Sequence, residues 1–309
     1  MKKVAVLAGG CSAEREVSLS SGKGILEALK EAGYDAFLVD IGHDVRPFVA
    51  AMYEKKPDVV FNALHGSFGE DGCVQGLLDL MQIPYTHSGR LASALGMDKT
   101  AAKKIYREAG LPVARERLVT KKDILAGDVM DGPFVLKPIE NGSSVGVFLF
   151  PDGCKGNPFE GKEYPYGENE VVMAEEYVAG RELTVAVDDD GPWDVLEIVP
   201  KDGFYDYHNK YTDGCAEHVC PARIPQNDYA VLLEAAQTAH KALGCRGISR
   251  SDFRYDDTKK GQPARWVILE TNTQPGMTPL SLVPDIGKHK GLSYRDIVVR
   301  LVETARCGA

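Results

Sequence analysis

Short apolar runs alternate with helical patterns through the first 86 residues, and no other feature of the sequence restricts the fold as strongly. Apolar runs predict strands at 4–8, 36–40, 59–62 and 83–86. Helical spacing of apolar residues appears between them, in a segment that ends near residue 32, at 45–53 and at 71–81. Such alternation is typical of an open parallel sheet with helices on both faces. We therefore predict an N-terminal α/β unit.

Two loops of this predicted unit, 9–14 and 65–71, follow strands. Because ligands bind open parallel sheets beyond the carboxyl ends of the strands, we expect both loops at one shared binding edge. The Gly9-Gly10 turn is a weak signal by itself, since it lacks the third glycine of a dinucleotide-binding fingerprint. A tight connection between a strand and a helix explains the turn equally well.

The pattern changes after residue 110. A helix at 97–109 leads out of the first unit, and Gly110 ends it. Strand-like runs then follow without regular helices between them, as in an antiparallel sheet, at 134–137, 145–150, 171–178 and 183–187. The segment 151–169 is rich in Gly, Pro, Lys and Glu and predicts a loop. The rest of the chain predicts strands at 193–199, 250–255 and 266–271 and helices at 229–243 and 294–305.

Charge and cysteine content narrow the class of protein. The formal net charge of −9 disfavours a nucleic-acid partner, because phosphate backbones are bound by basic surfaces. No segment approaches the roughly 20 apolar residues needed to cross a bilayer, so we expect no membrane partner. The 7 cysteines are odd in number and scattered, which fits a reducing compartment better than a disulfide framework. We expect a cytoplasmic protein.

A glycine- and serine-rich loop follows Lys137 between two predicted strands, with the sequence KPIENGSSVG at 137–146. Small residues allow backbone N–H groups to close around phosphate oxygens, and the lysine adds a positive charge. The sequence thus indicates a phosphate-binding loop. An ordinary hairpin connection beside a solvated lysine is the alternative.

Three oxygen ligands for a metal stand on two predicted strands near the C-terminus. Asp252 follows Arg250 by two residues and Asn272 follows Glu270 by two, so each pair shares one face of its strand. Carboxylate and amide oxygens suit Mg²⁺ that bridges nucleotide phosphates, and Arg250 could stabilise a transferring phosphoryl group. A solvent-exposed polar face is the alternative. The apolar run 267–269 argues against it, since charges beside a buried face need partners.

Six motifs resemble, in order, those of D-alanine–D-alanine ligases. They are GGCSAEREVS at 9–18, ALHG at 63–66, GEDG at 69–72, GSSVG at 142–146, FYDYHNKY at 204–211, and ETNTQPGMT at 270–278 with SLVP at 281–284. On this resemblance the chain is identified as a member of the ATP-grasp superfamily. The resemblance implies an open parallel α/β substrate domain at 1–98, a small central ATP-grasp lobe at 99–186, and a C-terminal ATP-grasp lobe with the metal and catalytic residues at 187–309.

The resemblance also implies the chemistry. ATP would phosphorylate the carboxylate of one D-alanine, and the amine of a second would displace the phosphate to give D-alanyl-D-alanine for peptidoglycan precursors. The cofactors would be ATP and two Mg²⁺ or Mn²⁺ ions, which offset the charge of the anionic reactants. Family members are commonly homodimers, so we expect a homodimer.

By the same resemblance, individual residues acquire roles. Nucleotide would be bound by Lys99, Lys137, Glu175, Tyr177, Glu182 and Lys210, and the metal ions by Asp252, Glu270 and Asn272. The catalytic set would be Glu14, Ser143, Tyr211, Arg250 and the backbone N–H of Gly276, with substrate contacts from His65, Ser281 and Leu282. Glu14, Ser143 and Tyr211 would form a hydrogen-bonded triad around the ammonium of the first D-alanine.

Several of these residues have a structural alternative. Glu14 could be an acidic residue favoured by the dipole at the start of a helix, and His65 could be a structural histidine. Cys215, His218 and Cys220 lie close enough in sequence to suggest a metal site, but without a fourth ligand their spacing indicates coincidence. His87 stands where glycine is common in the family, which we expect to affect a loop near the first subsite.

Other functions compete with this interpretation. A ligase that joins D-alanine to D-lactate tends to lack a tyrosine at the position of Tyr211, so this residue favours an amine nucleophile. A ligase that takes D-serine as its second substrate stays open. A non-catalytic ATP-binding regulator would be expected to have lost Arg250 or a metal ligand, and a dehydrogenase is disfavoured by the incomplete glycine fingerprint.

Overall fold

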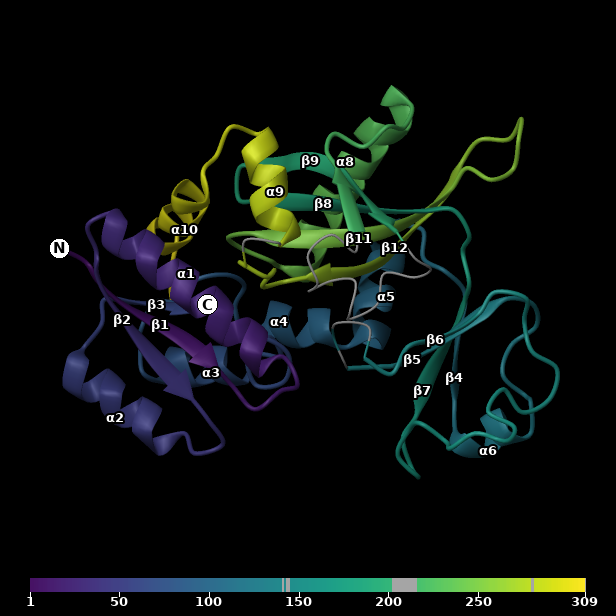
Figure 1. The fold of residues 1–309 in the computed structure, drawn as a ribbon, viewed down its shortest axis with the longest axis horizontal. Helices are drawn as coiled ribbons and strands as arrows, with labels where there is room; N and C mark the ends of the chain where they lie inside the picture. The colour runs from purple at the N-terminus through teal and green to yellow at the C-terminus, as the bar shows by residue number, and fades with distance from the viewer. Residues whose placement is uncertain (141, 143–144, 202–215, 279–280, 309) are drawn as a thin grey trace.

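The computed structural model describes residues 1–140, 142, 145–201, 216–278 and 281–308. The described strands form a three-stranded, a four-stranded and a five-stranded sheet. In Figure 1, the three-stranded and four-stranded sheets lie at opposite ends of the molecule, with the five-stranded sheet between them. None of the described helices has both the length and the apolarity needed to cross a bilayer.

The N-terminal unit is the predicted parallel α/β structure. Its sheet has the order β2-β1-β3, and its elements are β1 (Lys3–Gly9), α1 (Arg15–Glu31), β2 (Asp35–Ile41), α2 (Arg46–Lys55), β3 (Val59–Asn62) and α3 (Cys73–Leu80). Alternate residues of β1 face opposite sides of the sheet. Val4 and Val6 belong to one core with α1, while Ala5 and Leu7 belong to another with α2 and α3. Both faces are therefore covered by helices.

The predicted fourth strand at 83–86 is reduced to one parallel bridge between Tyr85 and Val60. Pro84 has no N–H to donate, so it contributes only its carbonyl, which accepts from Val60. His87 then turns the chain away with a φ of 66°. Glycine adopts this left-handed conformation without strain, so His87 keeps a glycine-like backbone and is buried against Phe61.

Two helices replace the single helix predicted at 97–109. α4 (Arg90–Met97) was not predicted, and α5 (Lys99–Glu108) begins after an extended residue, Asp98. The Asp98 carboxylate accepts hydrogen bonds from the backbone N–H groups of Thr100 and Ala101, which caps α5.

The four-stranded sheet is antiparallel, with the order β4-β7-β5-β6. Its elements are β4 (Glu116–Val119), α6 (Lys121–Leu125), β5 (Phe134–Pro138), β6 (Phe148–Phe150) and β7 (Val172–Glu176), of which β4 and α6 were not predicted. The predicted loop at 151–169 has no helix or strand, yet it packs tightly. Its Phe159 and Tyr166 are buried in the core of this sheet.

The five-stranded sheet is also antiparallel, with the order β10-β9-β8-β11-β12. Its elements are β8 (Arg181–Asp188), β9 (Gly191–Pro200), β10 (Ala216–Val219), α8 (Gln226–Leu243), β11 (Ser249–Asp256), β12 (Arg265–Asn272), α9 (Leu282–His289) and α10 (Tyr294–Glu303). Because β8 pairs with β9 and β11, the two antiparallel sheets divide between Glu176 and Arg181. A boundary at residue 186 would cut through β8.

One core connects the first and last parts of the chain. It joins β1 and α1 to β9, α9 and α10, whereas the four-stranded sheet has a separate core of its own. Asn62 and Gln274 strengthen the connection, because their side chains are buried and hydrogen-bonded to each other at 2.7 Å. The N-terminal unit is thus fixed to the C-terminal lobe.

Candidate active site

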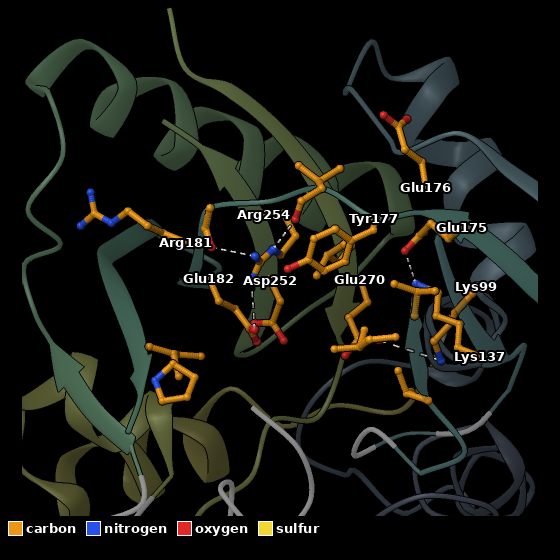
Figure 2. Close-up of a pocket in the computed structure, with 18 of the residues that line it drawn as sticks. Lys99, Lys137, Glu175, Glu176, Tyr177, Arg181, Glu182, Asp252, Arg254 and Glu270 are labelled. Carbon is orange, nitrogen blue, oxygen red and sulfur yellow. Dashed lines mark hydrogen bonds and ion pairs between the residues drawn. The ribbon is translucent and has the colours of Figure 1, made fainter. Parts of the chain in front are cut away.

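A cavity of about 600 Å³ lies between the four-stranded and five-stranded sheets. It is lined by residues from α5, β5, β6, β8, β9, β11 and β12 and from the end of β7. Seven residues that the sequence predicted for nucleotide or metal lie on its wall: Lys99, Lys137, Glu175, Tyr177, Glu182, Asp252 and Glu270. Figure 2 shows how these side chains gather around one space.

A buried carboxylate between two lysines forms one end of the cavity. Lys137 Nζ donates to Glu175 Oε2 at 2.6 Å, and Lys103 Nζ donates to Glu175 Oε1. Burial alone would raise the pKa of Glu175, but the charges and hydrogen bonds of the two lysines outweigh it and hold this pKa below its usual value. Lys137 is thus fixed by one hydrogen bond and retains further N–H donors for a ligand.

Lys103 was missed by the sequence analysis. It follows Lys99 by four residues on α5, so both lie on one face of the helix, and this spacing was the available signal. Lys103 is fully buried, and burial lowers its pKa although Glu175 and Glu116 oppose the shift. Lys99 has its Nζ 4.0 Å from Glu270 Oε2, at the opposite wall.

The predicted metal ligands come from neighbouring strands. Asp252 on β11 is directly opposite Glu270 on β12, and Arg250 is opposite Asn272, so the four side chains share one sheet face. Asp252 and Glu270 line the cavity. The Oδ1 of Asn272 accepts from the backbone N–H of Gln274 at 3.0 Å.

This donor set fits Mg²⁺, because two carboxylates and one amide supply hard oxygen atoms. Positive side chains already approach both carboxylates. Arg250 donates to Asp252 through Nε at 2.8 Å and Nη2 at 2.7 Å, and Lys99 stands near Glu270. Thr184 also donates to Asp252, at 2.5 Å, which fixes the orientation of this carboxylate. A metal ion at this wall would therefore compete with Arg250 and Lys99 for the two carboxylates.

Arg254 organises the wall beside Glu182 and was also missed. Its Nε donates to the carbonyl of Val178 at 3.0 Å and its Nη2 to that of Gly180 at 2.7 Å. Its Nη1 lies 3.7 Å from Glu182 Oε2. No pattern in the sequence pointed to Arg254, because its partners belong to a turn more than 70 residues away.

The two N-terminal loops meet at one edge, as predicted. Ser12 Oγ donates to the carbonyl of His65 at 2.7 Å. A methyl group at Gly142 would lie 3.6 Å from Glu14 Oε2, and Gly142 itself lines the cavity. Glu14 therefore adjoins the cavity through the loop that follows β5.

His65 is buried and bonded to Glu70, with Nδ1 3.0 Å from Oε1. Burial lowers the pKa of His65, but the hydrogen bond and the charges of Glu70 and Glu14 outweigh it, so this pKa lies above the usual histidine value. A methyl group at Gly276 would lie 3.9 Å from His65 Cε1 and 3.0 Å from Ser281 Oγ. His65, Gly276 and Ser281 are thus neighbours.

Ser281 is the N-cap residue of α9, and Leu282 is the first residue of the helix. Ser281 Oγ accepts from the backbone N–H of Thr278 at 2.9 Å, and the Leu282 side chain is buried in the core. Three predicted site residues, Ser143, Lys210 and Tyr211, lie outside the described residues. The predicted triad is therefore represented here by Glu14.

An α/β unit packed on the lobe of the five-stranded sheet, with lysines and paired carboxylates around the cavity between the two antiparallel sheets, defines an ATP-grasp ligase. Solved structures have this fold. A D-alanine–D-alanine ligase from Bacillus anthracis complexed with ATP matches with a TM-score of 0.81 and 30% identity, over 98% of this chain and 96% of that one. The VanG D-Ala:D-Ser ligase from Enterococcus faecalis matches with a TM-score of 0.79 and 30% identity, over 98% and 99%.

Sequence comparisons narrow the class to one family. The family model described as D-ala D-ala ligase C-terminus matches residues 105–303, and that of the N-terminus matches 3–57 and 49–88. A D-alanine–D-alanine ligase from Paramagnetospirillum magneticum is 52% identical over 99% of both chains, and one from Rhodospirillum rubrum is 49% identical over 100% of this chain and 99% of the relative. This chain belongs to the D-alanine–D-alanine ligase family.

Proposed function

We propose that this protein joins two D-alanine molecules to D-alanyl-D-alanine in an ATP-dependent reaction, through an acyl-phosphate intermediate, for peptidoglycan precursor synthesis. One observation carries the proposal: lysines and paired carboxylates share a cavity whose Gly142 edge adjoins Glu14 of the N-terminal unit. Phosphate-binding groups and a candidate amino-acid site are therefore contiguous. The family relatives named above support the same reaction.

ATP would occupy the cavity between the sheets. We assign Lys99 and Lys137 to its phosphates, Glu175 and Tyr177 to the adenine, and Glu182 to the ribose hydroxyls, with Lys210 added by the family resemblance. The fixed Lys137–Glu175 contact supports this assignment, because a cation held in place before binding loses little freedom when phosphate arrives. Arg254 would hold Glu182 in position.

Asp252, Glu270 and Asn272 would hold two Mg²⁺ or Mn²⁺ ions. Such ions, when bound, neutralise charge on the phosphates and on the carboxylate that attacks them. Arg250 would exchange its bond to Asp252 for a bond to the reacting groups. There its guanidinium would stabilise the negative charge that develops in the transition state.

The substrates would bind beside Gly142. Glu14, with Ser143 and Tyr211, would hold the first ammonium group, and His65 would line the same subsite. The backbone N–H of Gly276 would donate to the tetrahedral oxyanion, while Ser281 and the N–H of Leu282 would bind the second carboxylate at the start of α9. The protein would act as a homodimer in the cytoplasm.

Product analysis tests this function. Purified protein with ATP, Mg²⁺ and D-alanine is expected to yield ADP, phosphate and D-alanyl-D-alanine in equal amounts, and L-alanine serves as the control. Arg250→Ala should reduce turnover by a factor on the order of 1,000 while ATP still binds, because its charge acts mainly in the transition state. If D-alanine fails to stimulate ADP formation, the proposal is wrong.

D-serine as the second substrate is favoured by one observation, the likeness to the VanG D-Ala:D-Ser ligase. A reaction with equal concentrations of D-alanine and D-serine separates the two functions. We expect D-alanyl-D-alanine to dominate. A majority of D-alanyl-D-serine would assign the second subsite to D-serine instead.

A further inference from the structure

A cysteine, a histidine and an aspartate from three separate elements meet outside the cavity. Asp194 lies on β9, Cys220 follows β10, and His289 is the last residue of α9. In the part of the chain that the structure describes, one potential ligand atom of each lies within 4.8 Å of the other two. None of the three lines the cavity.

Two of these residues already contact each other. His289 Nδ1 and Asp194 Oδ2 are 2.7 Å apart. A simple surface ion pair would explain this contact, but it would not explain why the half-buried Cys220 thiol completes the group. The Cys220 Sγ has a weak contact, at 3.9 Å, with the carbonyl of Val195, the residue after Asp194.

A second contact between side chains joins the same part of the sheet to α9. His218, two residues before Cys220, has its Nδ1 2.7 Å from Asp285 Oδ2. Asp285 precedes His289 by four residues, so both lie on one face of α9. α9 packs against β9, and the two elements lie next to each other in Figure 1. The arrangement therefore holds α9 against the β9–β10 edge of the sheet.

We propose that Asp194, Cys220 and His289 bind one Zn²⁺ ion, with water as the fourth ligand. Sulfur, imidazole nitrogen and carboxylate oxygen are the ligand atoms that Zn²⁺ accepts in tetrahedral sites. A thiolate and a carboxylate would balance the two charges of the ion. The His289 side chain is 42% exposed, which leaves an entry path and room for the water.

Zn²⁺ would have to displace the thiol proton of Cys220. Burial, together with the charges of Asp194 and Asp285, raises the pKa of Cys220 to about 12. A thiolate at this position therefore needs a nearby cation, and Zn²⁺ would release the thiol proton to solvent as it binds. Mg²⁺ would not replace it, because Mg²⁺ prefers oxygen ligands in an octahedral arrangement.

The ion would cross-link three elements, while its water ligand leaves one position open, unlike the four protein ligands of a closed structural site. It would tie the end of α9 to β9 and β10, while the start of α9 carries Ser281 and Leu282. Zinc would thus stabilise the helix that we assign to the second substrate carboxylate. The binding itself does not depend on the ligase reaction, so a failure of either proposal leaves the other standing.

Cobalt titration of the metal-free full-length protein tests the site. Co²⁺ reports on ligands by absorption, and a thiolate-to-cobalt charge-transfer band requires a sulfur ligand. We expect this band to saturate at one equivalent and to disappear when Zn²⁺ is added. Asp252→Asn should leave it unchanged, because the oxygen ligands of the active site cannot produce it.

Three variants decide the outcome. Cys220→Ser should abolish the band, whereas Cys154→Ser, which removes another half-buried thiol near backbone carbonyls, should keep it. His289→Ala alters a partly exposed side chain and should weaken Zn²⁺ binding by more than the roughly 10- to 100-fold loss that follows removal of a residue that only supports a ligand. If the wild type lacks the band, or if the band survives Cys220→Ser, the proposed site is wrong. Unchanged Zn²⁺ affinity in His289→Ala would exclude the histidine ligand and overturn it as well.

Discussion

Lys103 is a charged side chain with no solvent exposure, and its environment explains how the cavity keeps Lys137 available for a ligand. A buried ammonium group is stable only beside negative partners. Lys103 has two, Glu175 and Glu116. It occupies one oxygen of Glu175, so Lys137 needs to neutralise only part of the carboxylate charge.

We predict that Lys103→Met lowers the free energy of unfolding by about 2 kcal/mol, because buried charged hydrogen bonds are lost. ATP affinity should fall roughly tenfold, equivalent to about 1.4 kcal/mol, since Glu175 would then draw Lys137 away from phosphate. Urea denaturation and calorimetric titration with ATP measure the two effects. Lys104→Met, an exposed neighbour on the same helix, is the matched control. Equal effects of both substitutions would contradict the argument.

Residues in motifs could be located from the sequence, whereas their supporting partners could not. Lys137, Asp252 and Glu270 belong to recognisable patterns, and the structure places all three on the cavity wall. Lys103 and Arg254 act through partners about 70 residues away. Periodicity does not encode such a contact, which arises only when distant strands pack together.

Among the elements, the joint between α4 and α5 matters most for the site, because α5 carries both Lys99 and Lys103. Asp98 breaks the helix with an extended conformation and caps α5. Burial alone would raise the pKa of Asp98, but hydrogen bonds from Thr100 and Ala101 outweigh it and hold the pKa below its usual value.

We predict that Asp98→Ala lowers the free energy of unfolding at pH 7 by about 1 kcal/mol, as expected for a lost N-cap. A lowered carboxyl pKa stabilises the fold above the unfolded-state pKa, and this contribution disappears as the pH falls through the folded-state pKa. The difference between wild type and variant should therefore shrink between about pH 5 and pH 3. Urea denaturation across this pH range measures the difference in unfolding free energy between wild type and Asp98→Ala.

Asp98→Asn provides the control, because asparagine caps helices as well as aspartate does but cannot titrate. The free energy of unfolding of Asp98→Asn should remain close to that of the wild type at pH 7. The contribution of its helix cap should not fall as the pH is lowered. A difference between wild type and Asp98→Ala that stays constant with pH would show that the carboxylate charge has no part in the cap.

Local sequence patterns predicted most helices and strands. They failed where the pairing of strands determines which sheet a segment joins. The run 183–187 was correctly predicted as a strand, but its alternation does not show which sheet it joins. In the structure β8 pairs with β9 and β11. Likewise, 83–86 has strand-like residues, yet Pro84 and the left-handed His87 allow only one bridge to β3, through Tyr85 and Val60. Elements are specified locally, whereas sheet membership depends on the whole chain.

On the scale of the whole molecule, the hydrophobic cores connect the N-terminal unit and the central lobe to the C-terminal lobe to different extents. The N-terminal unit and the C-terminal lobe share one hydrophobic core, whereas the described core of the four-stranded sheet consists of residues between Val119 and Ala174, and polar contacts such as Lys103–Glu175 join that sheet to α5. We therefore expect the central lobe to unfold first on heating. Nucleotide would contact both antiparallel sheets, so only the state with both of them folded would bind it.

Differential scanning calorimetry should accordingly resolve two transitions without ligand. A non-hydrolysable ATP analogue with Mg²⁺, at 100 times its dissociation constant, should stabilise the first by about 2.7 kcal/mol and move it toward the second. Both tryptophans, Trp193 and Trp266, lie on strands of the five-stranded sheet, so tryptophan fluorescence reports the second transition alone. The fluorescence transition should shift less than the first calorimetric peak.

Asp252→Asn, which weakens the metal site, should reduce the shift of the first calorimetric peak. If the ligand moved only the fluorescence transition, the lobes would not share the nucleotide, and the cavity between the sheets would not be its binding site.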